Sequence, residues 1–428
     1  MNENRKTMKL NTLCSYILYL GLLTAGSGLS GQTDITSWRG PLRNGIYPDV
    51  NLKTIWPEGG PEVLLKIEGI GKGYSSPAIY NKTIYVTGMK DSLDMLFAFD
   101  LKGNLLWKNA FGSSWSGTYP DSRNMPAIEN NKLYITSGMG EIVCFNAGNG
   151  ELIWKKNPHQ EFKGAFSQWG MAESILLTDI GVISSVGGKD AAVVALDKNT
   201  GNLLWKSPPT WDKRAYTSPI MIERNGNKII LVVLSENIMG INPHNGEILW
   251  TFNLVKDLTR ERGRRNNIST PLYKNGEIFI SSGYDADAVM LSLAEDGHSV
   301  KLKWKNPILD NHYGGVVEVI GYIYGSTWQS NSQGKWACVE WNSGKVMYEQ
   351  AWYNKGPVIY ADGHLYCMEE KSGNIALSLP EPSGFNIISS FRLQEGTGPY
   401  WAHPVIYDGK LFIRHGDVLM VYNIQDKN

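Results

Sequence analysis

One phrase recurs along this chain, and its repetition limits the fold more than any other feature does. The copy from Ala195 to Trp205 reads ALDKNTGNLLW, and near-copies end at Trp107, Trp154 and Trp250. Each copy reads as a strand, a polar turn with a glycine, and a second strand that ends in a large aromatic ring. A chain that repeats one hairpin in this way is predicted to adopt a repeat fold.

The spacing of these aromatic anchors predicts four-stranded blades. Weaker copies extend the series to Leu65, Trp304, Tyr348 and Phe391, and successive anchors are 42, 47, 51, 45, 54, 44 and 43 residues apart. A period in the forties is typical of β-propeller blades. Sustained helical periodicity is nearly absent. We therefore predict an all-β protein, an eight-bladed β-propeller of four-stranded antiparallel blades.

The two ends of the repeat series predict how the ring closes. The last unit, from Trp401 to Ile424, supplies three strands, whereas the segment from Pro61 to Ile67 reads as a fourth strand with no first three before it. An N-terminal strand on the outside of the last blade closes the ring and removes an exposed sheet edge. This count gives eight blades. Seven blades is the alternative, because the last two anchors are weak.

Within the repeated phrase we predict architecture and not chemistry. Asp197 begins the turn, where a short polar side chain can accept hydrogen bonds from nearby backbone N–H groups. Gly201 permits the positive φ that tight hairpins often need. Trp205 is expected to fill the wedge between adjacent blades. A catalytic group is usually needed once, whereas such a wedge is needed in every blade.

The phrase also carries a family resemblance. Ala195, Asp197, Thr200, Gly201 and Trp205 match the tryptophan-docking repeat A-x-D-x-x-T-G-x-x-x-W. The chain therefore resembles the PQQ-binding-like β-propeller repeat family over roughly residues 38 to 424. That family includes PQQ-dependent alcohol dehydrogenases and also BamB-like propellers without a cofactor. The resemblance implies the fold and leaves the activity open.

The first thirty residues differ from the rest. Arg5, Lys6 and Lys9 precede a short apolar run that ends at Leu23, and small residues follow it. This order predicts a signal peptide over residues 1–30, followed by a single propeller domain over residues 31–428. We expect an exported protein, periplasmic, secreted or at the cell surface, with no membrane span in its mature form. An uncleaved N-terminal anchor is the alternative.

Charge and cysteine content exclude several classes of protein. The chain has 41 Lys and Arg residues against 41 Asp and Glu residues, so there is no electrostatic case for binding nucleic acid. After the signal peptide, Cys144, Cys338 and Cys367 are isolated in apolar segments, which predicts buried free thiols. A pair between Cys338 and Cys367 is the alternative. A neutral, edge-free ring leads us to expect a monomer.

Any chemistry is expected on one face of the ring, where the loops before each first strand meet the loops between second and third strands. Arginine forks bind carboxylates and aromatic faces stack on flat groups, so the predicted pocket suits a small polar or anionic ligand, a glycan or an envelope protein. Several of these side chains could instead satisfy strand ends. The predicted site residues are Tyr74, Arg123, Gln168, Trp169, Arg214, Tyr216, Arg265, Asn266, His312, Trp328, Trp401 and His403. The same face is expected to carry Asp190, Glu236, Asp285, Glu369 and Arg414.

The resemblance implies PQQ with Ca²⁺ as the cofactor of the dehydrogenase members, with basic groups, an aromatic floor and metal-binding oxygens. Arg123, Arg214, Arg265 and Trp169 could hold the quinone, and Asn266 with a carboxylate could hold the metal. The chain lacks the adjacent Cys-Cys pair and the haem domain of alcohol dehydrogenases, and no linear motif fixes a catalytic base.

Other linear motifs of catalysis are also missing: GxSxG, HExxH and the P-loop do not occur. We therefore predict a ligand- or protein-binding module with no assigned cofactor, metal site or catalytic residue. A PQQ-dependent alcohol or sugar dehydrogenase is the alternative. A carbohydrate-active enzyme at the channel mouth is a third hypothesis.

Overall fold

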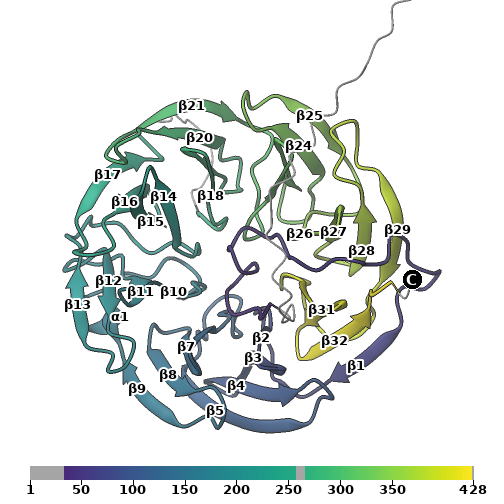
Figure 1. The fold of residues 1–428 in the computed structure, drawn as a ribbon, viewed down its shortest axis with the longest axis horizontal. Coiled ribbons are helices and arrows are strands. Elements are labelled where there is room, and N and C mark those ends of the chain that lie inside the picture. Colours follow the sequence, from purple (N-terminus) through teal and green to yellow (C-terminus); the bar gives the residue numbers. More distant parts are fainter. Residues whose placement is uncertain (1–32, 257–265, 427–428) are drawn as a thin grey trace, which may run out of the picture. The chain divides into compact units, whose positions relative to one another are not determined.

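Eight four-stranded antiparallel sheets stand side by side around a ring in the computed structural model (Figure 1). The structure describes residues 33–256 and 266–426, and the predicted signal peptide lies outside these ranges. The predicted all-β, eight-bladed propeller is confirmed. Within the described ranges the single helix is α1 (Pro158–Glu161), and no helix there is long and apolar enough to cross a membrane.

The blades follow one another in chain order, and in blades 1 to 7 the strands pair in sequence from the centre of the ring outward. Blades 1 to 4 contain, in turn, β2 (Ala78–Tyr80), β3 (Thr83–Lys90), β4 (Leu93–Asp100) and β5 (Leu105–Ser113); β6 (Ala127–Glu129), β7 (Lys132–Thr136), β8 (Ile142–Asn146) and β9 (Leu152–Lys156); β10 (Leu176–Leu177), β11 (Val182–Ser185), β12 (Val193–Leu196) and β13 (Leu203–Lys206); and β14 (Ile220–Arg224), β15 (Asn227–Val233), β16 (Asn237–Ile241) and β17 (Ile248–Asn253).

Blades 5 to 8 contain, in turn, β18 (Leu272–Lys274), β19 (Glu277–Ile280), β20 (Ala288–Leu293) and β21 (Val300–Asn306); β22 (Val317–Val319), β23 (Tyr322–Ser326), β24 (Trp336–Glu340) and β25 (Val346–Gln350); β26 (Val358–Ala361), β27 (His364–Met368), β28 (Asn374–Ser378) and β29 (Ile387–Arg392); and β30 (Val405–Tyr407), β31 (Lys410–His415), β32 (Val418–Asn423) and β1 (Val63–Ile67). Middle strands are largely buried, and β12 is apolar throughout, because neighbouring blades cover both faces of each sheet.

The ring closes as the sequence predicts. β1 lies outside β32 and pairs with it antiparallel, with Leu65 opposite Val421 and Ile67 opposite Leu419 (Figure 1). The last blade therefore contains the first strand of the chain, and its outer edge is occupied. This pairing supplies the missing fourth strand and decides between eight blades and seven.

The repeated tryptophan joins neighbouring blades. Trp154 on β9 donates from Nε1 to the main-chain oxygen of Lys198, in the turn of the next blade, at 3.0 Å. Gly201 in that turn has φ +70°, and a Cβ there would lie 2.7 Å from the Trp154 ring, so only glycine fits. Asp197 closes the turn, because its Oδ1 accepts from the amides of Asn199 and Thr200 at 3.0 and 2.8 Å. The same indole bond recurs from Trp107 to Ala147, Trp205 to Pro243 and Trp304 to Trp341.

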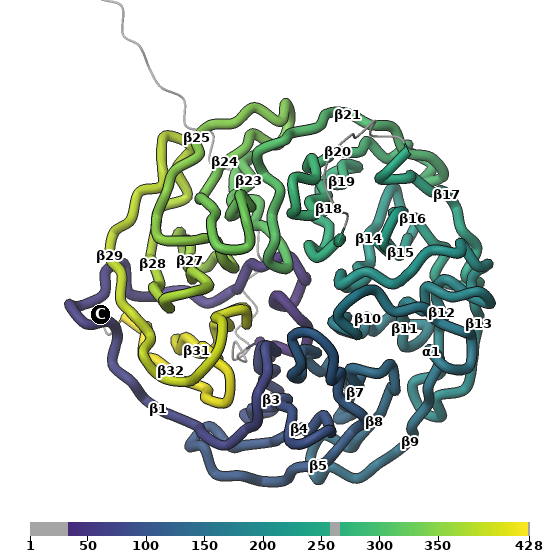
Figure 2. The backbone as a smooth tube through the Cα atoms, turned by 180° about the vertical axis from the view of Figure 1, so that it is seen from behind, coloured from purple at the N-terminus to yellow at the C-terminus, as the bar shows by residue number. Residues whose placement is uncertain are grey.

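A segment without any repeat character crosses the centre of the ring, and the sequence analysis did not anticipate it. It runs between an antiparallel bridge from Ile35 to Ile79 of blade 1 and a parallel bridge from Ile46 to Tyr360 of blade 7. The purple trace in Figures 1 and 2 shows this stretch inside the circle of blades.

Two buried arginines attach this crossing segment to blades on different sides of the ring. Arg39 donates to the main-chain oxygen of Val316 ahead of blade 6. Arg43 donates to the main-chain oxygens of Ser174 and Ile175, ahead of blade 3, at 2.7 and 2.9 Å. Both side chains are almost fully buried, at 1% and 5% exposure. Each guanidinium thereby satisfies carbonyl groups that face the channel and have no strand partner on that side.

The described cysteines are free and buried, as predicted, and the alternative pair is wrong. Burial raises the pKa of the Cys144 and Cys338 thiols to about 12, and it raises the pKa of Cys367 as well. These thiols are therefore protonated and unreactive in the folded protein.

Candidate functional site

The antiparallel order of the blades places the loops before each first strand and the loops between second and third strands on the same face. A pocket of about 430 Å³ opens on this face, within the range of roughly 300–1,000 Å³ typical of small-molecule sites. Loops from all eight blades and the crossing segment contribute to it. Its wall consists of Trp38, Tyr74, Thr118, Tyr119, Arg123, Met125, Gln168, Trp169, Ala172, Ser174, Tyr216, Ile268, Tyr284, His312, Tyr313, Gly314, Asn331, Glu370, Trp401 and His403.

Most of the predicted site residues lie together in this wall. The eight that line the pocket are Tyr74, Arg123, Gln168, Trp169, Tyr216, His312, Trp401 and His403. Trp328 does not line it and packs behind it, with its ring centre 5.2 Å from that of Tyr284. Asn266 does not line it either, and Arg265 lies outside the described residues.

Arg214 was predicted to contact a ligand, but it does not line the pocket. Its side chain is 3% exposed, lies 3.5 Å from the Glu173 carboxylate and donates to the Ser184 hydroxyl at 3.2 Å. These partners occupy the end of blade 3, so the guanidinium neutralises a buried carboxylate there. Arg414 is likewise fully buried, and it donates to the hydroxyl of Ser75 at 2.6 Å.

Six aromatic side chains of the wall touch one another in a closed circuit, which we call the aromatic girdle. Its members come from blades 2, 3, 5, 6 and 8, in the order in which these blades follow one another around the ring. The distances between successive ring centres are 6.4 Å from Tyr119 to Trp169, 6.3 Å from Trp169 to Tyr284, 4.6 Å from Tyr284 to His312, 5.1 Å from His312 to Tyr313, 6.5 Å from Tyr313 to Trp401 and 5.4 Å from Trp401 to Tyr119. Because the circuit follows the blade order, the girdle surrounds the mouth of the channel.

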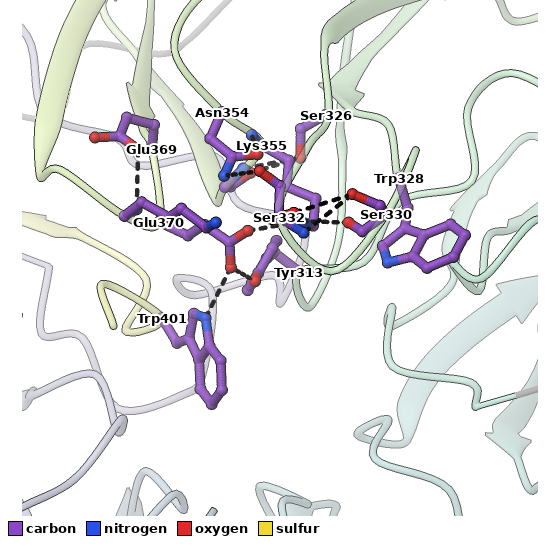
Figure 3. Close-up of polar contacts among 12 residues, drawn as sticks. Tyr313, Ser326, Trp328, Ser330, Ser332, Asn354, Lys355, Glu369, Glu370 and Trp401 are labelled. Atoms are coloured by element: carbon purple, nitrogen blue, oxygen red, sulfur yellow. Dashed lines mark hydrogen bonds and ion pairs between the residues drawn. The ribbon is translucent and has the colours of Figure 1, made fainter. Parts of the chain in front are cut away.

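A buried carboxylate holds one side of the girdle in place (Figure 3). Glu370 accepts hydrogen bonds from the Tyr313 hydroxyl and from Nε1 of Trp401, the latter at 3.0 Å. Its other oxygen lies 2.6 Å from Nζ of Lys355, which also donates to the main-chain oxygen of Ser330 at 2.9 Å. The side chains of Lys355 and Glu370 are 0% and 5% exposed.

Burial acts on both charges of this pair. It raises the pKa of Glu370 and lowers the pKa of Lys355, because each charged form loses its hydration. The contact between Nζ and the carboxylate opposes both shifts, so each charge depends on the other. The sequence analysis selected the neighbouring Glu369 in this loop. The Glu369 carboxylate instead accepts from the amides of Lys371 and Ser372 and shapes the turn.

Arg123 holds the opposite side of the girdle. Its two terminal nitrogens donate to the main-chain oxygens of Tyr119 and Trp169, which are consecutive members of the girdle. Burial lowers the pKa of Arg123, but a guanidinium remains charged at neutral pH. Arg123 therefore positions two aromatic loops, and these contacts use two of its five N–H groups.

Several polar atoms of the wall have no hydrogen-bond partner among the described residues. They are both ring nitrogens of His312, both ring nitrogens of His403, and Nε1 of Trp169. Burial lowers the pKa of His312 to about 3 and that of His403 well below its usual value, so both rings are neutral at pH 7. A neutral imidazole offers one N–H donor and one acceptor nitrogen. An unsatisfied buried polar group costs about 1–3 kcal/mol, but these nitrogens are covered by protein, so a ligand could reach them only after the rings turn.

The donor set of the wall does not match PQQ with Ca²⁺. Among the described lining residues only Arg123 and Glu370 carry a charge, and both are engaged in the contacts given above. Ca²⁺ takes six to eight oxygen ligands, and no group of three or more His, Cys, Asp or Glu side chains able to hold a metal occurs in the described ranges. PQQ carries three carboxylates, and binding them would need more than one available basic side chain.

Comparison with known proteins identifies the family. The sequence profile described as "Outer membrane protein assembly factor BamB" matches residues 92–381, more than half of the chain. The chain belongs to the BamB family. It is 23% identical over 292 residues to the outer membrane protein assembly factor BamB of Moranella endobia (strain PCIT), an alignment that covers 64% of this chain and 69% of that protein. The predicted resemblance to PQQ-like repeat propellers is confirmed.

Solved structures of two kinds share the fold of this BamB family member. BamB from Moraxella catarrhalis superposes with a TM-score of 0.62 at 13% identity, covering 85% of this chain and 99% of that chain. A europium-containing methanol dehydrogenase superposes with a TM-score of 0.66 at 12% identity, covering 90% of each chain. At these identities the likeness concerns the fold alone.

Proposed function

We propose that this protein is an exported binding module that takes a small polar ligand, or a segment of an envelope protein, into the pocket at its channel mouth. The observation that carries the proposal is the aromatic girdle around a cavity of about 430 Å³ to which loops of all eight blades contribute. Pockets of this kind bind through apolar contact, with a few polar groups that fix orientation. The proposal includes no redox catalysis.

Export is the second part of the proposal. The basic, apolar and small-residue order of residues 1–30 supports it. The BamB relative, named as an outer membrane protein assembly factor, also favours a place in the cell envelope. We propose a monomer in the periplasm or at the cell surface, with no cofactor required for binding.

The first test separates binding from quinone catalysis. The purified protein is mixed with PQQ and CaCl₂, and its melting temperature and its dye-linked oxidation of alcohols and sugars are measured. We expect no thermal shift and no dye reduction, because the wall offers one cationic side chain, Arg123, for three carboxylates, and Glu370 is paired with Lys355. Tight PQQ binding together with dye reduction would show that the protein is a dehydrogenase.

The second test asks whether the pocket binds anything. A set of sugars, polyols, amino acids, dipeptides and nucleosides is screened by saturation-transfer NMR against the wild type and Trp401→Ala. The matched control is Trp211→Ala, since Trp211 is 74% exposed and does not line the pocket. We expect at least one compound to bind with a Kd of about 1 mM or tighter and to lose its signal only in Trp401→Ala. Signals of equal strength in all three proteins would place binding elsewhere and refute the proposal.

A further inference from the structure

We infer that the ligand of this pocket is a neutral saccharide, bound by the aromatic girdle at the end of a glycan chain. This inference rests on the proposed binding function and adds the chemical class of the ligand. It follows from four properties of the wall: the inclination of its rings, its balance of charge, its unpartnered polar atoms and its closed inner end.

The inclination of the rings favours a ligand with thickness over a flat one. Tyr119 and Trp401 meet at 62°, Tyr284 and His312 at 77°, and His312 and Tyr313 at 88°. Rings at such angles enclose a volume, whereas a planar ligand needs parallel faces above and below it. A pyranose chair has C–H groups on both faces, and their partial positive charges pack well on the negative faces of aromatic rings.

The charge of the wall excludes strongly charged ligands. A quaternary ammonium ion would need an available carboxylate, or an aromatic cage with no positive charge beside it. Here the Glu370 carboxylate is paired with Lys355 at 2.6 Å, and Arg123 places a positive charge in the wall. A polyanion would need several available basic groups, and the terminal nitrogens of Arg123 donate to main-chain oxygens. The wall therefore disfavours cations and ions of high negative charge, and a neutral ligand needs no counter-charge from it.

The unpartnered polar atoms match hydroxyl groups. A sugar hydroxyl donates one hydrogen bond and accepts others, and a neutral imidazole also presents one donor and one acceptor. His403 is 5% exposed, lines the pocket and has no partner at either ring nitrogen among the described residues. Both ring nitrogens of His312, a member of the girdle, also have no partner among the described residues, and neither does the donor Nε1 of Trp169. These nitrogens are covered by the surrounding side chains, so the rings must turn before a sugar hydroxyl can reach them, and the aromatic faces supply the first contact.

The inner end of the pocket favours the terminus of a chain. Trp38 belongs to the crossing segment and lines the pocket, with its ring centre 5.2 Å from that of His403. Arg43 of the same segment is bonded to the oxygen of Ser174, another lining residue. A segment tied across the ring in this way bounds the pocket, so we infer that a glycan enters by one end and does not thread through the channel.

The test is isothermal titration of the full mature chain with defined probes. The neutral probes are the methyl glycosides of glucose, galactose, mannose, xylose, fucose and N-acetylglucosamine, with maltose, cellobiose and chitobiose as short chains. Glucuronate, choline and nicotinamide are the charged and planar comparators. We expect at least one neutral probe to bind with a Kd of about 10 μM to 1 mM, and no comparator to bind as tightly.

The variants locate the binding. Trp169→Ala and Tyr119→Ala should each weaken it at least tenfold, and Trp211→Ala should leave it unchanged. Tyr119 is 49% exposed, so its truncation tests the girdle with little risk to folding. His403→Gln, which keeps a donor and an acceptor on a different shape, should weaken binding less than His403→Phe does.

The outcomes distinguish the two proposals. Binding of choline, nicotinamide or glucuronate that is lost in Tyr119→Ala, with no neutral saccharide bound at about 10 mM, overturns the saccharide class and leaves the pocket as a binding site. Saccharide binding that survives in Trp169→Ala and Tyr119→Ala overturns both the class and the site. Absence of binding by every probe overturns the saccharide inference.

Discussion

Replacing Lys355 by methionine would remove the ammonium group from a buried ion pair and leave the Glu370 carboxylate without its counter-ion. The two side chains are 0% and 5% exposed, and Nζ lies 2.6 Å from the carboxylate. Removing one partner of such a pair typically costs about 3–5 kcal/mol.

The same reasoning predicts how this loss depends on pH. In Lys355→Met the folded-state pKa of Glu370 lies above its unfolded value, so between these values the folded state binds more protons than the unfolded state. The stability of the variant therefore falls as pH rises through this window. We expect a loss of about 3 kcal/mol relative to the wild type at pH 8 and a smaller loss at pH 5, where part of the carboxylate is protonated in the variant.

Urea denaturation followed by tryptophan fluorescence, with wild type and variant at both pH values, measures this difference. The matched control is Lys355→Met combined with Glu370→Gln, whose neutral amide still accepts from Tyr313 and Trp401. We expect the double variant to regain at least half of the lost free energy of unfolding at pH 8. An equal loss at pH 5 and pH 8, or a double variant as unstable as the single one, would refute the account of this pair.

Other parts of the structure give further predictions. Trp154→Ala should lower the free energy of unfolding by about 3–5 kcal/mol, because it removes a wedge between blades and the bond to Lys198, whereas Leu152→Ala, at a 55% exposed position, should change it by less than about 0.5 kcal/mol. Equal losses of unfolding free energy in the two variants, measured by urea denaturation, would contradict the packing role of Trp154 between blades. Folding keeps His403 and His312 neutral, so wild-type stability should fall below pH 6.5, with each ring contributing up to about 1.4 kcal/mol per pH unit, and His403→Gln should remove one of these contributions. If the slope of stability against pH is the same in His403→Gln, the dependence on pH comes from another group. Ellman's reagent should label thiols only in denaturant, and rapid labelling of the native protein would show that some are accessible; the thiols concerned are Cys144, Cys338 and Cys367.

The architecture could be predicted because its determinants are local and repeated. The turn that starts at Asp197, the glycine at 201 and the tryptophan four residues later specify a hairpin within a dozen residues. The same short-range pattern occurs in blade after blade, so errors in one copy do not change the count. Closure through β1 could also be predicted, since an unpaired strand at each end of a ring has one obvious partner.

The site could be predicted only in part, because loop side chains take their direction from contacts distant in sequence. Tyr119 and Tyr284 join the girdle, yet neither lies in a motif that marks it. Side chains of adjacent residues also point in different directions, since the Glu370 carboxylate faces the pocket whereas the Glu369 carboxylate closes a turn. Arg214 turns toward Glu173, a partner 41 positions earlier in the chain. No local sequence pattern predicts the directions of these side chains.

The crossing segment shows a different limit. Trp38, Arg39 and Arg43 stand in a stretch that matches no repeat, and their bonds reach main-chain oxygens far along the chain. The length of the stretch before β1 and its two arginines are the signals that were available in the sequence. Predicting that this segment crosses the ring requires knowledge of which carbonyl groups face the channel. That is a property of the assembled ring.

The central claim is that the aromatic girdle at the channel mouth is the ligand site, and ¹⁵N NMR of the tryptophan indole groups tests it most directly. The protein is titrated with the saccharide that binds best in calorimetry, and indole signals are assigned with single Trp→Phe variants. We predict that the signals of Trp169 and Trp401 shift with the calorimetric Kd, while those of Trp154 and Trp205 between the blades stay in place. Shifts confined to Trp211 or to the tryptophans between blades, with none at Trp169 and Trp401, would contradict the account.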